Sequence, residues 1–228
     1  MSEVPVITID GPSGVGKGTV SQLLAAALGW HWFDSGALYR IVAWACRFYQ
    51  IPPEDITAIV SKIQTLDVKF TPTSNQLTLQ ILVDGHDVTQ SIRTEACGQL
   101  ASKISSIPVI RHTLLAMQRR YRQLPGLVTD GRDMGTVVFP DALLKIFLTA
   151  STEVRAERRY KQLQQKGLDV SLRQIFQDLI DRDERDANRA IAPAKPATDA
   201  IIIDTSELSI DEVMVKVNAL VEGVITAR

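Results

Sequence analysis

A glycine-rich segment near the start of the sequence contains residue types that could hold a chain of phosphates. The segment GPSGVGKGT spans residues 11–19, after an apolar run and before a stretch rich in Ala and Leu. Its glycines would let successive backbone N–H groups point inward, and the positive end of a following helix would add to their attraction for phosphate. The ammonium group of Lys17 would reach the terminal phosphates. The predicted nucleotide-binding residues are Gly11, Pro12, Ser13, Gly14, Val15, Gly16, Lys17, Gly18 and Thr19.

Two oxygen-bearing side chains are candidates for binding Mg²⁺ beside those phosphates. In the usual loop pattern a hydroxyl residue directly follows the lysine, whereas here Gly18 follows and the hydroxyl belongs to Thr19. Asp130 ends a later apolar run, as the acidic residue that holds the metal or its water does in such proteins. We therefore expect Thr19 and Asp130 to bind Mg²⁺, directly or through water. A glycine-rich turn without a ligand is the alternative interpretation, but it does not explain why a lysine, Lys17, stands among the glycines.

Arginines occur at helical spacing in two places where folding alone gives little reason for them. Arg155, Arg158 and Arg159 lie at i, i+3 and i+4, so a helix would crowd like charges on one face. An anionic ligand would relieve that repulsion, and we expect Arg155 and Arg158 to be catalytic cations. A solvated face of charges is the alternative interpretation.

The second group of arginines also contains a carboxylate. Arg182, Arg185 and Arg189 repeat the spacing, with Asp186 on the same face. Favourable spacings to acidic residues at 178 and 181 make a solvated ladder a serious alternative, above all for Arg185.

Arg111 has an unusual position for a different reason. It lies in the first turn of a helix expected to begin near Pro108, where the positive end of the dipole disfavours a cation, so a ligand-binding role is favoured.

Fixed cations of these kinds are what phosphoryl transfer requires, because negative charge spreads over the transferred group in the transition state. The sequence contains no Asn-Lys-x-Asp, Asp-x-x-Gly or Leu-Ser-Gly-Gly segment of the kind typical of GTPase switches and transporter ATPases. An ATP-dependent kinase is the function that remains.

Alternating apolar runs and helical patterns predict the elements that must position these residues. Strands are expected at residues 4–10, 127–130, 143–149 and 200–204, and helices at 17–28, 37–49, 55–66, 93–104, 109–122, 152–166, 172–189 and 210–225. Strands that alternate with helices indicate an α/β fold with a central parallel sheet. Residues 67–92 break this rhythm: Leu77, Leu79, Ile81 and Val83 alternate up to Asp84-Gly85. That pattern predicts a small inserted antiparallel sheet.

Length and composition place the chain among globular proteins. With 228 residues and 45% hydrophobic residues, one main domain with an appended module is expected. No apolar run approaches the roughly 18 residues of a membrane helix, and no signal peptide is visible, so we expect a cytoplasmic protein without membrane contact. The net charge of −1 argues against a broad nucleic-acid surface. Cys46, Cys97 and the three histidines are scattered, and we assign them no metal-binding or catalytic role.

Four segments in this order carry a resemblance to a known family. They are GPSGVGKGT, FDSGALYR (33–40), DGRDMGT (130–136) and RDERDANRAIAP (182–193). Together they resemble the bacterial cytidylate kinases, nearly from end to end. The resemblance implies a P-loop NTPase-type three-layer α/β fold, with a core at 1–36 and 111–228, a lid near 155–170, and an acceptor-binding domain at 37–110 with the β insertion near 67–92. It also implies a monomer that uses ATP and Mg²⁺ and phosphorylates CMP and dCMP.

The resemblance also assigns roles to individual residues. Catalytic roles fall on Lys17, Arg132, Arg155, Arg158 and Arg189, and contacts to the acceptor phosphate on Ser35, Tyr39, Arg40, Arg132 and Arg189. Ser102, Arg111 and Asp133 are implied to read cytosine, and Arg182 with Asp186 to contact the ribose. A carboxylate facing the C4 amino group and a guanidinium facing N3 and O2 would match cytosine chemically. Helix capping by residues 34 and 35, and an ion pair between Arg132 and Asp133, are the structural alternatives.

Other functions remain compatible with the same motifs. Another small-acceptor kinase of this fold could act on UMP, AMP or shikimate. A regulatory protein that binds a nucleotide as a switch would share the phosphate loop without turnover.

Overall fold

The computed structural model describes residues 4–72, 79–165 and 167–226. The chain divides into two compact units, one formed by residues 1–33 and 121–228 and the other by residues 34–120. Leu77, which belongs to the alternating pattern described above, lies outside the described residues. Within those residues no helix has both the length and the hydrophobicity needed to cross a membrane.

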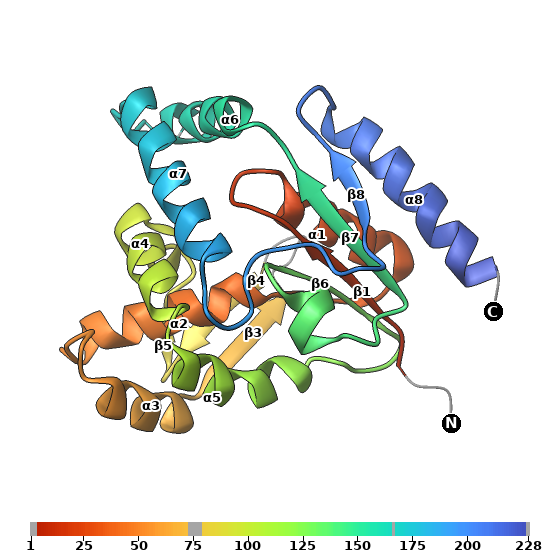
Figure 1. Cartoon of the computed structure of the whole chain (residues 1–228). Coiled ribbons are helices and arrows are strands. Elements are labelled where there is room, and N and C mark those ends of the chain that lie inside the picture. Colours follow the sequence, from red (N-terminus) through yellow and green to blue (C-terminus); the bar gives the residue numbers. More distant parts are fainter. Residues whose placement is uncertain (1–3, 73–78, 166, 227–228) are drawn as a thin grey trace. The chain divides into compact units, whose positions relative to one another are not determined.

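A sheet of parallel strand pairs forms the centre of the first unit (Figure 1). Its order is β2 (His31–Asp34), β6 (Leu127–Gly131), β1 (Val6–Asp10), β7 (Leu144–Thr149) and β8 (Ile201–Asp204). Strand β1 pairs in parallel with β6 and β7, and β7 pairs in parallel with β8. Strands β1 and β6 are buried along their whole length, which explains why both begin with apolar residues. The predicted α/β class with a central parallel sheet is confirmed.

Helices α1 (Lys17–Leu28) and α8 (Ile210–Thr226) pack on this sheet and contact each other. Their apolar side chains recur at helical spacing, with Val20 and Leu24 on α1 and Val213, Val217 and Val221 on α8. These residues bury against Ile7, Ile9 and other strand residues in the main hydrophobic cluster. The helix that follows the phosphate loop is therefore fixed to the sheet by its whole apolar face.

Helices α6 (Thr152–Gln165) and α7 (Leu172–Ala187) pack against each other and have a hydrophobic cluster of their own. Ala156 and Leu163 from α6 meet Ile175 and Leu179 from α7. On α7, Arg182 and Asp186 follow Ile175 and Leu179 at helical spacing, so these polar residues continue the stripe of the cluster toward the end of the helix.

The second unit contains helices and a small sheet. Its helices are α2 (Ser35–Phe48), α3 (Ile56–Thr65), α4 (Glu95–Ile104), α5 (Pro108–Arg119) and the short 3₁₀ helix η1 (Ser91–Arg93). The sheet has the order β3 (Val68–Pro72), β4 (Leu79–Val83) and β5 (His86–Asp87), with antiparallel pairing throughout. The predicted antiparallel insertion is confirmed.

A tight turn at Asp84 and Gly85 joins β4 to β5, and both residues have positive φ, 48° and 81°. The Asp84 carboxylate accepts hydrogen bonds from the Tyr49 hydroxyl (2.6 Å), the Lys62 ammonium (2.9 Å) and the Asp67 backbone N–H (2.9 Å). These bonds, the one from Tyr49 above all, lower the pKa of Asp84 to about 2. One side chain therefore joins α2, α3 and the small sheet.

Asp84→Asn is expected to lower the free energy of unfolding by about 1 to 2 kcal/mol at pH 7, because Asn tolerates the turn but cannot replace all three bonds. Since the folded-state pKa of Asp84 is depressed, its contribution is present above the ordinary Asp range and is lost as pH falls toward 2. Urea unfolding of both proteins at pH 7 and pH 2.5 tests this. The difference should shrink at low pH, and exposed Glu54→Gln should show no such difference at pH 7. An equal difference at both pH values contradicts the assignment.

Strand β2 and the turn at Met134–Val138 are among the elements that the sequence patterns did not predict. Strand β2 (HWFD) has only one buried side chain and no β-branched residue, so it lacks the apolar run by which the other strands were found. Residues Met134–Val138 form a short π-helical turn, η2. Its i to i+5 bond from the Phe139 N–H to the Met134 carbonyl has no local sequence signature.

Candidate active site

The candidate residues of the first unit gather at the carboxyl edge of its sheet. Chain segments leave this edge after β1 as the phosphate loop, after β6 as DGRDMGT, after β7 at the start of α6, and after β8 at Thr205. Ligands of open parallel sheets bind at this edge, because the loops there are free to differ. Four segments that are distant in sequence therefore meet in one region. They are residues 10–19, 130–136, 155–158 and 182–189.

The phosphate loop is held close to the sheet and curled by its glycines. A Cβ on Gly11 would lie 2.1 Å from the carbonyl oxygen of Leu148, so only glycine fits there. Gly14 and Gly16 have φ values of 84° and 92°, in the left-handed region that favours glycine. Lys17 is buried, and its ammonium donates a 2.6 Å hydrogen bond to the carbonyl of Pro12, within the same loop. Burial, with the Arg132 guanidinium nearby, lowers the pKa of Lys17.

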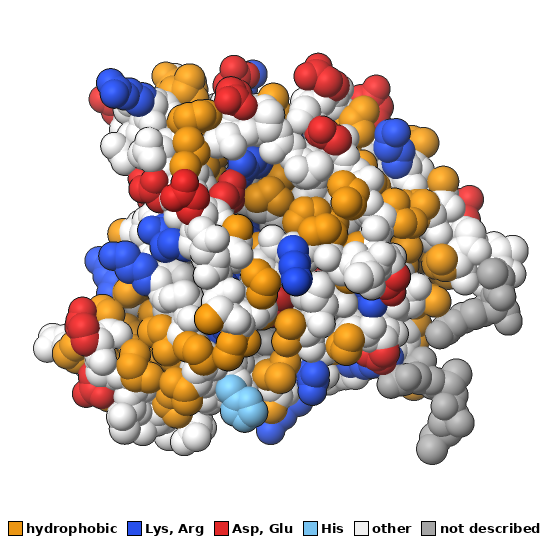
Figure 2. Space-filling model, viewed as in Figure 1, with side chains coloured by type: hydrophobic (Ala, Val, Ile, Leu, Met, Phe, Trp, Pro, Cys, Tyr) orange, Lys and Arg blue, Asp and Glu red, His pale blue; other side chains and the backbone are white. Residues whose placement is uncertain are grey.

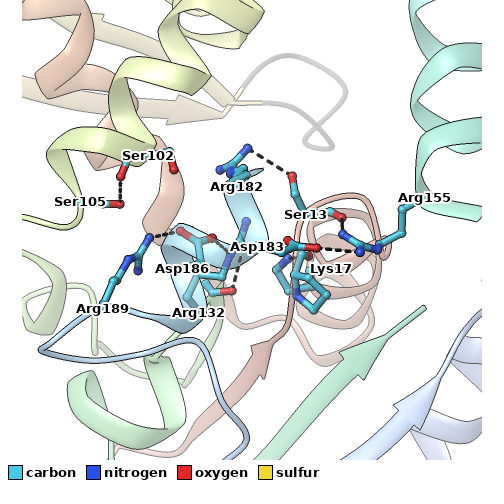
Figure 3. A network of polar contacts seen from close by, with 12 residues as sticks. Ser13, Lys17, Ser102, Ser105, Arg132, Arg155, Arg182, Asp183, Asp186 and Arg189 are labelled. Atoms are coloured by element: carbon cyan, nitrogen blue, oxygen red, sulfur yellow. Dashed lines mark hydrogen bonds and ion pairs between the residues drawn. The ribbon is translucent and has the colours of Figure 1, made fainter. Parts of the chain in front are cut away.

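Ser13 is contacted by arginines from both helices of the α6–α7 pair (Figure 3). Arg155 donates to the Ser13 carbonyl (3.1 Å), and Arg182 donates to the Ser13 hydroxyl (3.2 Å). The Arg155 guanidinium also forms a 2.7 Å ion pair with Asp183, which was not among the predicted residues. Arg155 and Arg182 are thus anchored at the tip of the phosphate loop.

Asp186 joins two of the predicted phosphate-binding arginines (Figure 3). One carboxylate oxygen accepts from Nε of Arg132 at 2.7 Å, and the other accepts from Nη2 of Arg189. Asp186 is 2% exposed. Burial alone would raise its pKa, but the guanidinium groups of Arg132, Arg189 and Arg182 lower it, so the carboxylate is ionised at neutral pH. The Asp186 carboxylate therefore holds two guanidinium groups close together, one on each of its oxygens.

Arg158 is the candidate that lies apart from the loop contacts. Its guanidinium donates to the hydroxyl of Thr205 (3.2 Å), the carbonyl of Thr205 (2.6 Å) and the carbonyl of Leu208 (3.2 Å). In this arrangement Arg158 fastens α6 to the connection between β8 and α8. Its catalytic role stays a prediction, and the structure adds this anchoring role.

The predicted metal ligands are side chains of suitable chemistry. Asp130 is buried at the end of β6, and one of its oxygens accepts a 3.1 Å hydrogen bond from the indole of Trp32. Thr19 is exposed in the first turn of α1. A carboxylate and a hydroxyl are oxygen donors of the kind Mg²⁺ prefers. Across the described ranges, no group of three or more His, Cys, Asp or Glu side chains is arranged to hold a metal alone.

Asp133 is buried beyond the end of β6, next to η2. Its carbonyl accepts from the N–H groups of Val137 (2.9 Å) and Val138 (3.2 Å). The next two N–H groups, of Met134 and Gly135, donate to the carboxylate of Asp10 at 2.9 and 2.8 Å. Burial raises the pKa of Asp10 to about 6, against the effect of these two bonds. Asp10 was not predicted as a site residue.

In the second unit, Ser35 and Tyr39 are buried on α2, and Arg40 follows on the same helix. Arg40 donates to the carbonyl of Ile92 at 3.0 Å, and its guanidinium packs close to Gly98 of α4, where a Cβ would lie 3.0 Å from Nη1. The carboxylate of Asp34 accepts from the Ala37 N–H at 3.2 Å, so helix capping is confirmed for Asp34.

Two of the three predicted cytosine readers also lie together in the second unit. The Ser105 hydroxyl donates to the Ser102 carbonyl (2.9 Å), and the Ser105 carbonyl accepts from Arg111 (3.1 Å). Arg111 lies over the ring of Tyr39, 5.6 Å from its centroid, and is buried in the first turn of α5 as expected.

Three residues near the predicted set were missed: Asp10, Trp32 and Asp183. Asp10 directly precedes the phosphate loop at the carboxyl end of a central strand, and this position alone could have identified it. Asp183 lies one residue from Arg182, but it contacts Arg155, which is remote in sequence. Trp32 lies in strand β2, which lacks the apolar run typical of the other strands of this sheet.

The sheet, the glycine loop with its buried lysine, and the arginines around it define the P-loop class of α/β proteins. Residues 7–223 match the family model described as cytidylate kinase. A protein of Aeromonas hydrophila named cytidylate kinase is 53% identical over 218 residues, 96% of this chain and 94% of that one. Another with this name, from Shewanella denitrificans, is 52% identical over 218 residues, 95% and 96% of the two chains. The chain belongs to the cytidylate kinase family.

The fold has a counterpart among solved structures. An uncharacterized protein from Eubacterium ventriosum superposes with a TM-score of 0.51 at 12% identity, over 97% of this chain and 99% of that one. At this identity the likeness concerns the fold alone.

Proposed function

We propose that this protein transfers the terminal phosphoryl group of ATP to CMP, and to dCMP as a second acceptor. The observation that carries the proposal is the convergence of Lys17, Arg132, Arg155 and Arg182 on the region of the phosphate loop, in a chain more than half identical to proteins named cytidylate kinase. Such cations suit a reaction in which negative charge spreads over the transferred group.

The chemistry needs little from the protein beyond position and charge. A phosphate oxygen of the acceptor is already a competent nucleophile, so no general base is required. The loop N–H groups and Lys17 would hold the donor phosphates, and Arg132 and Arg189 the acceptor phosphate. Ser35, Tyr39 and Arg40 remain proposed contacts to the acceptor phosphate.

Magnesium is part of this proposal, with Thr19 and Asp130 as its ligands, directly or through water. When bound, Mg²⁺ would neutralise charge on the donor phosphates. The Trp32 indole, by donating to Asp130, would fix the orientation of that carboxylate.

A panel of acceptors tests the function. Purified protein would be supplied with Mg-ATP and, separately, CMP, dCMP, UMP, AMP or shikimate, and ADP would be measured with a coupled assay against the rate without acceptor. CMP should give the highest kcat/KM. A higher value for another acceptor would replace CMP in the proposal, and no turnover with any acceptor would favour a nucleotide switch.

Positive and negative side chains are interspersed on the visible surface (Figure 2). Such a surface suits a small substrate better than a large polyanion.

Asp133→Asn is expected to reduce kcat/KM for CMP. The expected loss of transition-state stabilisation is about 1 to 3 kcal/mol, the range for one good base-edge pair. An amide can turn either its oxygen or its nitrogen toward the base, so the rejection of the C4 oxygen of uracil should weaken. UMP should therefore lose less than CMP. The quantity to measure is the ratio of kcat/KM for CMP to that for UMP, since a folding defect lowers both. Reduced activity with an unchanged ratio would show that Asp133 does not read the base.

A further inference from the structure

Asp10 is a buried carboxylate whose two oxygens both accept hydrogen bonds from backbone N–H groups. It is 5% exposed, and its oxygens accept from the N–H groups of Met134 (2.9 Å) and Gly135 (2.8 Å). These are consecutive backbone groups immediately after Asp133. One side chain at the end of β1 therefore holds the segment that carries a predicted base reader, 124 residues away in sequence.

The backbone at Gly135 approaches β1 unusually closely. A Cβ there would lie 2.8 Å from the Thr8 hydroxyl and 3.2 Å from the Lys145 side chain, so a larger residue would force these neighbours or the turn to shift. Thr8 and Asp10 are two residues apart on a strand and point to the same face. Bonds from Val137 and Val138 to the Asp133 carbonyl close the turn from its other side. The turn is thus fixed at both ends around Asp133.

A carboxylate suits this position better than its amide analogue. Two N–H donors need two acceptor oxygens, and Asn would place an NH₂ group against one of them. The ionised group is retained although burial raises its pKa to about 6, with Asp133 adding to the rise and Lys17 opposing it. Burying an ionised carboxylate costs free energy, so an apolar residue would be favoured here if it could hold the turn equally well.

We propose that Asp10 is a positioning residue for acceptor selection: by binding the N–H groups of Met134 and Gly135, it sets the orientation in which Asp133 meets the base. This inference rests on the proposed function. Displacement of a recognition group by about 1 Å can cost up to roughly 10²-fold in rate, so a loosened turn should be measurable.

Asp10→Asn tests the proposal through the CMP-to-UMP ratio of kcat/KM. We expect this ratio to fall about 10-fold, since Asp133 would lose its fixed orientation. Removing a negative charge near Lys17 would affect both acceptors alike, because it concerns the donor side, and so it leaves the ratio unchanged. Amide hydrogen exchange at Met134 and Gly135 should accelerate in the same variant. Asp204→Asn is the matched control: Asp204 also ends a strand and accepts a backbone N–H, that of Ser206 at 2.8 Å. It should keep the ratio.

A double-mutant cycle separates positioning from a general effect. In a protein that already carries Asp133→Asn, adding Asp10→Asn should change the ratio no further, whereas independent effects would add. Asp10→Ser, which keeps one acceptor, is the second variant if Asp10→Asn does not fold. An unchanged ratio in a folded Asp10 variant, or failure of both variants to fold, would overturn the role in selection. If the unaltered protein shows no CMP preference in the acceptor panel, the proposed function fails first, and the two failures are thereby distinguished.

Discussion

Lys17→Met is expected to lower kcat by a factor on the order of 10² to 10³ while the protein stays folded, the scale for removing one preorganised charge-stabilising donor. Lys17 is buried at the phosphate loop and donates to the Pro12 carbonyl, so its ammonium is already beside the proposed donor phosphates. Met fills a similar volume and leaves the loop backbone intact. The measurement is kcat with saturating Mg-ATP and CMP, with thermal unfolding as the check on folding.

Lys145 provides a matched control for this change. It is another buried lysine, and it also donates at 2.6 Å to a proline carbonyl five residues earlier, that of Pro140, while pairing with Asp199. It lies outside the proposed machinery. Lys145→Met should therefore lower stability and leave kcat close to that of the unaltered protein. A near-normal kcat for Lys17→Met would refute the assignment of the phosphate loop.

Asp186→Ala is expected to reduce the free energy of unfolding by about 3 to 5 kcal/mol, the range for breaking a buried ion pair by removing one partner. The change would leave the guanidinium groups of Arg132 and Arg189 without the carboxylate that now lies between them. Because the pKa of Asp186 is lowered in the folded protein, this stabilisation is present at pH 7 and is lost as pH falls below the ordinary Asp range. Chemical denaturation at pH 7 measures it.

Phosphate gives this prediction a second readout. An anion bound by Arg132 and Arg189 would replace the lost charge, so inorganic phosphate should raise the Tm of Asp186→Ala more than that of the unaltered protein. Asp199→Ala, which removes the exposed partner of Lys145, is the control and should gain no more from phosphate than the unaltered protein does. Equal stabilisation of all three proteins would show that the two arginines do not form an anion site.

The elements that local patterns specify were predictable. The helix from Lys17 to Leu28 follows from its glycine loop and its apolar period, and the turn at Asp84 and Gly85 from residues that tolerate positive φ. The gathering of the phosphate loop and the DGRDMGT segment could be expected as well, because both follow parallel strands and such strands end at one edge.

The partners of individual charged groups were not predictable. Arg155 and Arg158 shared one expectation, yet Arg155 contacts Ser13 whereas Arg158 contacts Thr205 and Leu208. These contacts depend on tertiary packing across many residues, which spacing along a helix does not encode. Asp10 shows the same limit. Its partners are backbone N–H groups, and a backbone group carries no residue identity that a sequence pattern could reveal.

The cluster shared by α6 and α7 has a thermodynamic consequence. Ala156, Leu163, Ile175 and Leu179 are buried by each other, and the contacts of this helix pair with the loop and with the β8–α8 connection are largely polar. A change of tilt would therefore break hydrogen bonds and expose little apolar surface. Since the heat capacity of a conformational change follows the apolar surface exposed, such a movement would have a small heat-capacity change, and its equilibrium would depend on temperature through a nearly constant enthalpy.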